Sequence, residues 1–482
     1  MLNFTKKILA TFILVTSVCF AVAGQTNVSG GIYTNTTWTS VNSPYIIVDT
    51  VVVFPGVTLT IQPGVVVKFA NNKRLEIREA KLAALGTVAD SITFTSNSLS
   101  PIQGIWSSIY LNAGAGTDTL KFNYCNFKYA DVALNGNNYN SNYSLVIKNS
   151  VFSYNNTAIT SNWCNDALID SCTFNNNLDY GIRGLTNFHV NFCKFINNGI
   201  GLSKYVFLTT YAYITSCDFY YNETGISDLC TCVVENCTVK HNQYGISDGP
   251  YGGSYSVVKN CIIDSNYIAG LTINDGDSII NNKIRYNPIG LTDSMDVFFF
   301  DNIISKNIIE NNDVGIKLFF SFNQVYCNKI SNNTTYDLYY SVVFGSNLNA
   351  GNNYWSTFDS MATTAKIYDG YDNISLGLVN FMPLDSEQCY LQNGIATNTI
   401  SAVPVISLSI FPNPVSNNLT VTLPANILGT EIKIFNTLGE LEYSSSAMAQ
   451  TIDIDVSTLS RGVHIFQITA GNNISREKFI KQ

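Results

Sequence analysis

From Cys125 to Leu338 the sequence repeats a short pattern of apolar and polar positions. In each repeat an apolar residue precedes an Asn by three positions, and a small residue followed by an aliphatic one comes three or four positions after that Asn. The unit Phe174-x-x-Asn177 with Gly181-Ile182 is typical. Short apolar runs of this kind, bounded by Asn and Gly, predict strands and turns rather than helices.

One further position of the repeat, two residues before the apolar one, marks its period. It is occupied by Cys125, Ser150, Cys172, Cys193, Cys217, Cys237, Cys261, Asn282, Asn307 and Asn328, which are 20 to 25 residues apart. A period of this length indicates stacked structural units. Leucine-rich repeats also have such a period, but they need a Leu-rich consensus with a helix or 3₁₀ segment, and this sequence has neither.

We therefore predict an all-β fold in which each repeat is one coil of three short parallel strands. Each coil would hydrogen-bond to the next, about 4.8 Å along the axis. The same side chain on successive coils would then stack on itself. Cys and Phe or Ile would point inward, and Asn and Gly would form the corners, because Asn tolerates left-handed backbone and its amide can bond to its copies above and below.

This pattern resembles the right-handed parallel β-helix repeat proteins, a group of secreted bacterial proteins in the pectate-lyase-like superfamily. The resemblance covers most of the chain and implies a single-stranded, right-handed β-helix (a solenoid) of about thirteen coils. It implies little about function, because one fold supports many functions.

The chain begins with a segment typical of a secretory signal peptide. Residues 1–24 carry Lys6 and Lys7, then an apolar run that ends in an Ala-Val-Ala site. The run is short for a membrane span, so we expect cleavage after Ala23 or Gly24 and no transmembrane anchor afterwards.

The remaining segments follow from their turns and from the need to cover the ends of a solenoid. Two Pro-Gly turns within Val51–Phe69 separate three alternating strands. An Asn353-Tyr-Trp355 segment and an Asp369-Gly turn are similar to features that close many β-helices of this type. The expected organisation is a signal peptide (1–24), an N-terminal cap with the first coils (25–123), regular repeats (124–344), a C-terminal cap (345–385), a linker (386–403) and a small β-sandwich (404–482).

The last block alternates short strands with tight turns, which predicts the β-sandwich. It contains Phe411-Pro-Asn-Pro, Leu459-Ser-Arg-Gly-Val and the ending Lys478-Phe-Ile-Lys. These motifs together are similar to the type A C-terminal sorting domain of the type IX secretion system of Bacteroidota, with mild departures at Phe411 and His464. The resemblance implies that residues 404–482 engage the type IX secretion machinery, and that the protein is released or attached to the outer-membrane surface.

Amino-acid composition and net charge limit the kinds of molecule that the protein is expected to bind. The 482 residues include only 12% charged residues, with 28 Tyr, 28 Phe and a net charge of −8, which suits a strand-rich solenoid. An acidic chain without a Lys/Arg cluster is a poor candidate for binding nucleic acid or an anionic membrane. We expect a monomer that faces a polysaccharide or a cell-surface glycan.

Of the twelve cysteines, those on the repeat row are expected to be stacked, buried thiols rather than disulfides between coils. Cys164, Cys327 and Cys389 lie off this row and are the candidates for a free or paired thiol. Metal binding through cysteine is not indicated, because Cys-x-x-Cys is absent and the chain has only three His.

The candidate catalytic and metal-binding residues lie just after each Gly-aliphatic pair. That position holds Arg183, Ser203, Ser227, Ser247, Thr272, Thr292 and Lys317, and the next holds Gly184, Lys204, Asp228, Asp248, Ile273, Asp293 and Leu318. Four consecutive coils would therefore place Arg183, Lys204, Asp228 and Asp248 along one wall, with neighbours about 5 Å apart if the coils stack in register.

This wall suggests two reactions. β-Elimination on a uronate polymer needs a base, for which Lys204 or Arg183 would serve, and a cation such as Ca²⁺, for which Asp228 and Asp248 would supply oxygen ligands. Glycoside hydrolysis needs two carboxylates, and Asp228 would act with Asp248 or Asp293. The same Gly-Ile-Ser-Asp sequence is also an ordinary way to leave a strand, in which case no cofactor is required.

Recognition is the other reading of this region. Exposed aromatic residues near the same corners would suit stacking on sugars, although packing under loops is the alternative. These residues are Tyr154, Tyr180, Tyr205, Tyr220, Tyr221, Tyr244 and Tyr267. The sequence therefore predicts an exported carbohydrate-binding or adhesive structural module, with a polysaccharide lyase or glycoside hydrolase that acts on an acidic polysaccharide as the alternative.

Overall fold

The computed structural model describes residues 24–112, 119–136, 143–161, 164, 166–184, 187–204, 212–248, 255–293, 300–321, 323–342, 346–385, 389, 409–422, 431–436, 441–446, 449, 451–470 and 473–482. The predicted signal peptide, apart from Gly24, and the predicted linker, apart from Cys389, lie outside these residues. The chain forms two compact units, Met1–Gly394 and Ile395–Gln482.

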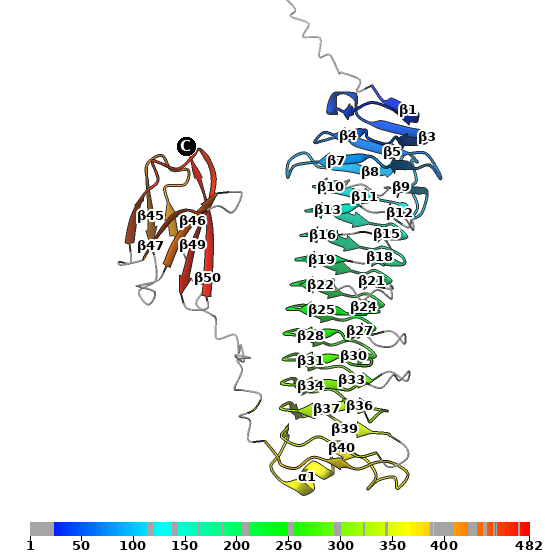
Figure 1. The fold of residues 1–482 in the computed structure, drawn as a ribbon, viewed down its shortest axis with the longest axis vertical. Coiled ribbons are helices and arrows are strands. Elements are labelled where there is room, and N and C mark those ends of the chain that lie inside the picture. Colours follow the sequence, from blue (N-terminus) through cyan, green and yellow to red (C-terminus); the bar gives the residue numbers. More distant parts are fainter. Residues whose placement is uncertain are drawn as a thin grey trace, which may run out of the picture. The chain divides into compact units, whose positions relative to one another are not determined.

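The first unit is a parallel β-helix whose coils stack into three walls (Figure 1). Wall 1 is a 13-stranded parallel sheet. Its strands are β2 (Thr36–Trp38), β4 (Thr58–Ile61), β7 (Lys81–Leu85), β10 (Thr119–Asn123), β13 (Ser144–Lys148), β16 (Asp166–Asp170), β19 (Phe188–Asn191), β22 (Ala212–Thr215), β25 (Cys232–Glu235), β28 (Val257–Lys259), β31 (Ser278–Ile280), β34 (Asn302–Ser305) and β37 (Asn323–Tyr326).

Walls 2 and 3 belong to one larger sheet, because the long strand β3 (Tyr45–Val53) pairs with β5 (Val66–Phe69) of wall 2 and with β6 (Leu75–Arg78) of wall 3. The first strand, β1 (Thr26–Ile32), pairs with β3 along both parts. Wall 2 continues with β5 (Val66–Phe69), β8 (Ile92–Ser96), β11 (Cys125–Lys128), β14 (Val151–Ser153), β17 (Thr173–Asn175), β20 (Lys194–Ile196), β23 (Asp218–Tyr220), β26 (Thr238–Lys240), β29 (Ile262–Asp264), β32 (Lys283–Arg285), β35 (Ile308–Glu310), β38 (Lys329–Ser331) and β41 (Tyr354–Trp355).

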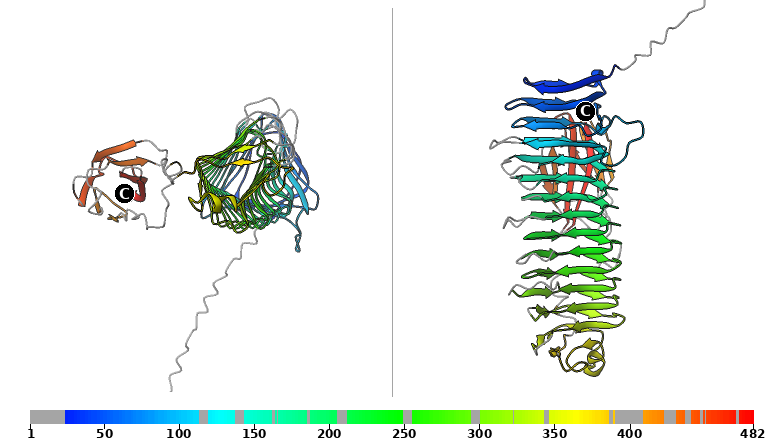
Figure 2. Two further views of the ribbon diagram at one scale, coloured as in Figure 1. Left: turned by 90° about the horizontal axis from the view of Figure 1, so that it is seen from below. Right: turned by 90° about the vertical axis from the view of Figure 1, so that its right-hand side faces the viewer.

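Wall 3 runs beside it with one strand from each coil. These strands are β6 (Leu75–Arg78), β9 (Trp106–Asn112), β12 (Ala130–Asn135), β15 (Thr157–Thr160), β18 (Tyr180–Arg183), β21 (Ile200–Ser203), β24 (Thr224–Ser227), β27 (Tyr244–Ser247), β30 (Ala269–Ile273), β33 (Ile289–Asp293), β36 (Val314–Leu318), β39 (Tyr336–Tyr340) and β42 (Ile367–Tyr368). Figure 2 shows the coils end-on and from the side.

Both ends of the repeats carry extra elements. A 3₁₀ turn, η1 (Ser40–Asn42), lies in the first coil, while β40 (Leu348–Asn349), β43 (Val379–Asn380) and the short helix α1 (Ser360–Thr364) lie at the other end. The pairing of walls 2 and 3 continues into this end, since β38 pairs with β41 and β39 with β42. The all-β solenoid of about thirteen coils predicted from the repeat is confirmed.

The apolar row of the repeat packs inside the coils as predicted. Phe174, Phe195 and Phe219 pair in register on successive strands of wall 2 and are fully buried. Their rings stack with centroids 4.7 and 4.6 Å apart. Identical coils therefore place identical side chains at one azimuth, as a solenoid of hydrogen-bonded repeats requires.

The repeated Asn forms a buried amide ladder at the corner between walls 2 and 3. The side-chain oxygen of Asn222 accepts hydrogen bonds from the backbone and side-chain amides of Asn198, at 2.9 and 3.0 Å. Its amide nitrogen donates to the carbonyl of Phe195 and to the side-chain oxygen of Asn242, both at 3.0 Å. The same pattern runs from Asn155 to Asn333, so each corner satisfies its buried polar groups through its neighbours.

The cysteine row lies at the corner between walls 1 and 2, where it is buried and unoxidised as predicted. The backbone amide of Cys172 donates to the sulfur of Cys193, and that of Cys193 donates to Cys217, both at 3.4 Å. Burial raises the pKa of the Cys193 and Cys217 thiols well above the ordinary value, so they remain protonated. Asparagine takes over the row from Asn282, which accepts from the amide of Cys261 at 2.9 Å.

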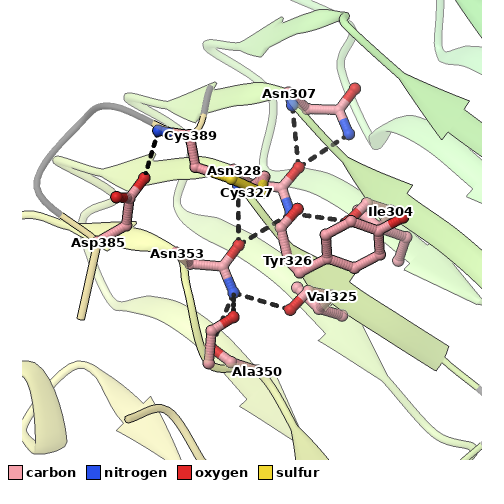
Figure 3. Close-up of a disulfide and its surroundings, with 11 residues drawn as sticks. Ile304, Asn307, Val325, Tyr326, Cys327, Asn328, Ala350, Asn353, Asp385 and Cys389 are labelled. Atoms are coloured by element: carbon pink, nitrogen blue, oxygen red, sulfur yellow. Dashed lines mark hydrogen bonds between the residues drawn. A yellow bond between two sulfur atoms is a disulfide. The ribbon is translucent and has the colours of Figure 1, made fainter. Parts of the chain in front are cut away.

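A disulfide joins Cys327 to Cys389, two of the three cysteines that the sequence left open (Figure 3). Cys327 precedes Asn328, a member of the cysteine row, and the backbone amide of Cys389 donates to Asp385 at 2.9 Å. The third, Cys164, is a buried thiol that donates to the carbonyls of Tyr143 at 3.3 Å and Asp166 at 3.2 Å, and burial raises its pKa to about 12. The disulfide thus fastens the chain that leaves the cap to one of the last regular coils.

The second unit is a small antiparallel β-sandwich, as predicted. One sheet holds β44 (Ser409–Phe411), β45 (Asn418–Thr422) and β48 (Thr451–Asp455), and the other holds β47 (Leu441–Ser446), β46 (Glu431–Asn436), β49 (Gly462–Ala470) and β50 (Asn473–Lys481). Leu419, Ile434 and Phe466 are among the buried residues of their common core. His464 is also buried and lies 2.7 Å from the Glu442 carboxylate.

Candidate functional site

The outward row of wall 3 stacks in the register that the sequence indicated. Arg183 pairs with Ser203, Ser203 with Ser227 and Ser227 with Ser247. The row continues through Thr272, Thr292 and Lys317. Neighbours on this row are therefore about one strand spacing, roughly 4.8 Å, apart.

Arg183 lies on this outward row and is exposed. Its guanidinium group lies 5.0 Å above the ring of Tyr180, a cation–π contact on the surface of the wall. Lys204 belongs to the following row, at the position where the chain leaves wall 3. The two predicted bases thus differ in environment.

Lys204 is completely buried, and its ammonium group donates to the Cys230 carbonyl and, at 3.0 Å, to the Thr231 hydroxyl. Cys230 and Thr231 have positive φ angles of 35° and 60°, a conformation that costs energy in residues other than Gly. The lysine therefore holds a strained turn on the next coil.

The two candidate carboxylates contact the same turn or the strand ends beside it. Asp228, with a φ of 50°, accepts from the hydroxyls of Ser203 at 2.8 Å and Ser227 at 3.0 Å. Asp248 accepts from the backbone amide of Leu229 at 3.0 Å. The structure thus brings Lys204, Asp228 and Asp248 together around residues 228–231, in contacts that order the corner of the wall.

The catalytic and Ca²⁺-binding roles of these residues stay predictions. In the part of the chain that the structure describes, no group of three or more His, Cys, Asp or Glu side chains is placed to hold a metal ion. A base that serves β-elimination must reach its substrate, and Lys204 would have to leave its two oxygen partners to do so.

Asp293, the third candidate carboxylate, is buried farther along the wall. It accepts from the backbone amides of Phe319 at 2.8 Å and Phe320 at 3.1 Å, and from Asn323 at 3.2 Å. Burial raises the pKa of Asp293 to about 6, although these hydrogen bonds oppose the shift. Burial likewise raises the pKa of Asp275 and Asp337.

A pH effect on stability follows. The folded protein favours the neutral form of the Asp293 carboxyl. The contribution of this group to the free energy of unfolding is therefore fully present below about pH 4 and is lost as the pH rises through 6. We expect the free energy of unfolding to fall by on the order of 2 kcal/mol over that range. Chemical denaturation of wild type and of Asp293→Asn at both ends of the range measures this. The substitution should reduce the difference, the exposed-site control Asp166→Asn should preserve it, and an unchanged difference in Asp293→Asn would contradict the assignment.

The predicted tyrosines separate by environment. Tyr154, Tyr221, Tyr244 and Tyr267 are exposed. Tyr180 and Tyr220 are half-buried, and the Tyr220 hydroxyl donates to Asp218 at 3.3 Å. Tyr205 lies outside the described residues.

Two of these tyrosines belong to a corner row that the sequence analysis did not recognise. The row lies immediately before the buried ladder position, and every member has a positive φ between 53° and 67°. Its members are Tyr129, Tyr154, Asn176, Asn197, Tyr221, His241, Ser265, Tyr286, Asn311 and Asn332. We call its five ring-bearing members, Tyr129, Tyr154, Tyr221, His241 and Tyr286, the aromatic corner row. The recurring dipeptide Tyr-Asn at 154, 221 and 286 was the available signal.

A second aromatic group, Tyr336, Tyr339 and Tyr368, lies at the end of wall 3 and was also missed. Tyr339 and Tyr368 pair on neighbouring strands but are 29 residues apart in the sequence. The chain between them belongs to the cap, where the repeat pattern is lost. No local sequence pattern predicts that contact.

Comparison with known proteins agrees with this architecture. Residues 134–287 match the family model of the right-handed β-helix region, and residues 409–482 match that of the secretion system C-terminal sorting domain. A search of curated proteins finds no significant match.

Two solved structures are distantly similar. One, a mutant of the periplasmic alginate epimerase AlgG, is 11% identical with a TM-score of 0.34, over 60% of this chain and 73% of that one. The other, the A-module of the Azotobacter vinelandii mannuronan C-5 epimerase AlgE6, is 10% identical with a TM-score of 0.27, over 70% and 86% of the two chains. Likeness at this level says nothing about activity or ligand.

The chain is therefore a right-handed β-helix protein that carries a type IX secretion sorting domain. The sorting domain implies interaction with the type IX secretion machinery and delivery to the cell surface or the extracellular space. Within the described segments, every helix is too short or too polar to cross a membrane.

Proposed function

We propose that the β-helix is a carbohydrate-binding, adhesive structural module that the sorting domain delivers to the cell exterior. The observation that carries the proposal is the aromatic corner row. Tyr154, Tyr221 and Tyr286 expose 46%, 58% and 54% of their surface on coils of the same solenoid. Tyrosine combines a flat apolar ring with a hydroxyl, which suits the faces and edges of sugar rings.

The backbone conformation at this corner argues against a purely structural role for the rings. A left-handed conformation favours Gly or Asn, and Asn occupies the same row at Asn176 and Asn197. A tyrosine there costs more backbone energy, and the exposed rings of Tyr154, Tyr221 and Tyr286 do not fill the core. The rings also hold one another in place, since Tyr129 stacks on Tyr154 at 6.1 Å and Tyr221 on His241 at 5.3 Å.

The test exchanges rings for the residue that the corner already accepts. Tyr154→Asn, Tyr221→Asn and Tyr286→Asn should leave the fold intact and lower retention on an immobilised polysaccharide, by about threefold to tenfold in affinity per ring. Tyr371→Asn is the matched control, because Tyr371 is exposed at 79% in the cap and lies off the row.

Two outcomes would oppose the proposal. One is that no polysaccharide in a broad panel retains the wild-type protein. The other is that the triple corner variant binds as the wild type does. Unsaturated sugar products formed during incubation with uronate polymers would instead support the lyase hypothesis.

A further inference from the structure

The last coils of wall 3 carry a second aromatic surface, distinct from the corner row. On the outward row Thr292 pairs with Lys317, Lys317 with Tyr339 and Tyr339 with Tyr368. The rings of Tyr339 and Tyr368 stack with centroids 4.5 Å apart and an interplanar angle of 2°. Tyr336 leans against both, at 5.8 and 5.6 Å. Three half-buried rings thus form one continuous surface near the cap, where β36 and β39 lie in Figure 1.

A cation borders this surface. The Lys317 ammonium nitrogen lies 5.4 Å from the centre of the Tyr339 ring and 5.2 Å from that of Phe319. Among the ion pairs within the described residues, none includes Lys317, whereas the outward cations Arg285 and Lys329 of wall 2 pair with Asp264 and Glu310. Lys317 therefore has ring faces as its neighbours, and these attract its charge without neutralising it.

Two acidic residues in the described part of the adjoining coils, Asp293 and Asp337, do not compete for this lysine. Asp293 is buried and accepts from the amides of Phe319 and Phe320. Asp337 is also buried and accepts from the side chains of Asn333 at 2.8 Å and Ser356 at 3.2 Å. Within the described residues neither carboxylate is available to Lys317, so this ammonium group can accept an anion supplied by a ligand.

The rest of the row shows that the strand does not require aromatic residues at this position. Ser247, Thr272 and Thr292 occupy the same position on the three coils before that of Lys317. Their hydroxyls can donate to and accept from sugar hydroxyls. From Ser247 to Tyr368 the row advances by five coils, or roughly 24 Å at one strand spacing per coil, and so offers one side chain per coil to an extended polymer.

We propose that this row is a binding track for a polysaccharide whose sugars carry an anionic group. Tyr339 and Tyr368 would stack on a sugar ring, Lys317 would pair with the carboxylate or sulfate of that sugar, and the hydroxyl row would contact the units that follow. The inference rests on the proposed carbohydrate-binding function and adds to it a second site and the charge of the ligand.

Calorimetric titration of the full exported chain with three oligosaccharides of equal length tests the track: an oligouronate, a sulfated neutral backbone and the same backbone unsulfated. Lys317→Met should lower affinity for the anionic ligand by about tenfold, and Lys317→Arg should retain it. Lys283→Met, at an outward position of wall 2, is the matched control and should bind as the wild type does. The uronate and sulfate arms identify the anion.

A second variant preserves the strand while it removes the platform. Tyr339→Thr introduces the residue type found at Thr292 on the same row and should weaken binding of every oligosaccharide on the track by at least fivefold. Anionic binding that survives both Lys317→Met and Tyr339→Thr would overturn the inference, as would equal affinity of the wild type for the neutral and anionic ligands. If such binding is lost in the Tyr221→Asn corner variant, the proposed function stands without the track. If the wild type binds no oligosaccharide or polymer, both fail.

Discussion

Replacing Asn222 with alanine is expected to lower the free energy of unfolding of the β-helix by roughly 3–6 kcal/mol. The substitution removes the acceptor of two amides of Asn198 and the donor to the carbonyl of Phe195. It also takes one of the donors from Asn242. Each buried polar group that loses its partner costs about 1–3 kcal/mol, and water cannot easily replace the side chain inside a tightly packed corner.

Guanidinium chloride unfolding measures the loss, and hydrogen exchange locates it. Because each coil contacts only its neighbours, amides of the coils next to Asn222 should lose protection first. Asn191→Ala is the control, since Asn191 is an outward, half-buried residue of wall 1. If the two alanine variants are equally stable, the amide ladder does not stabilise the solenoid.

Removal of the disulfide by the double substitution Cys327→Ser and Cys389→Ser is expected to destabilise the cap by about 4 kcal/mol. The bond joins residues 62 positions apart and so restricts a long loop of the unfolded chain. That loop contains α1 and the last strands of walls 2 and 3. The cap should therefore open well before the regular coils unfold.

Proteolysis and hydrogen exchange of residues 346–385 report that opening. Cys230→Ser is the matched control, because Cys230 is a free and only half-buried cysteine. Reduction of the wild type without denaturant should reproduce the effect of the double substitution. Equal protection of the cap in the oxidised protein and in the double variant would contradict the expectation.

The repeated part of the molecule was predictable from sequence because equivalent residues make the same contacts in each coil. A residue such as Phe195 has its counterpart at the equivalent position of each neighbouring coil. A residue type that recurs in the sequence therefore reveals whether the side chain points inward and which residue it stacks on. The Asn and Cys rows follow the same logic, and their burial follows from their period. The sorting domain was recognisable from three short motifs near its turns and its end.

The candidate site was only partly predictable. The sequence placed Arg183 and Lys204 on neighbouring rows, but it did not show that one is exposed over Tyr180 while the other is buried against Cys230 and Thr231. The fate of Lys204 depends on a turn 26 residues later, in the corner of the coil where length and sequence vary most. A side chain whose partners lie in a variable loop leaves no periodic pattern in the sequence.

By itself, the sequence determined the coil, the three walls, the inward rows and the exported character of the chain. Only the tertiary structure decided that Cys327 joins Cys389, that the aromatic corner row shares one left-handed backbone position, and that Lys317 borders the rings of Tyr339 and Tyr368. The physical reason is that hydrogen bonding between identical coils fixes everything that repeats, whereas contacts made by loops and by the cap depend on the path of chain segments that occur once.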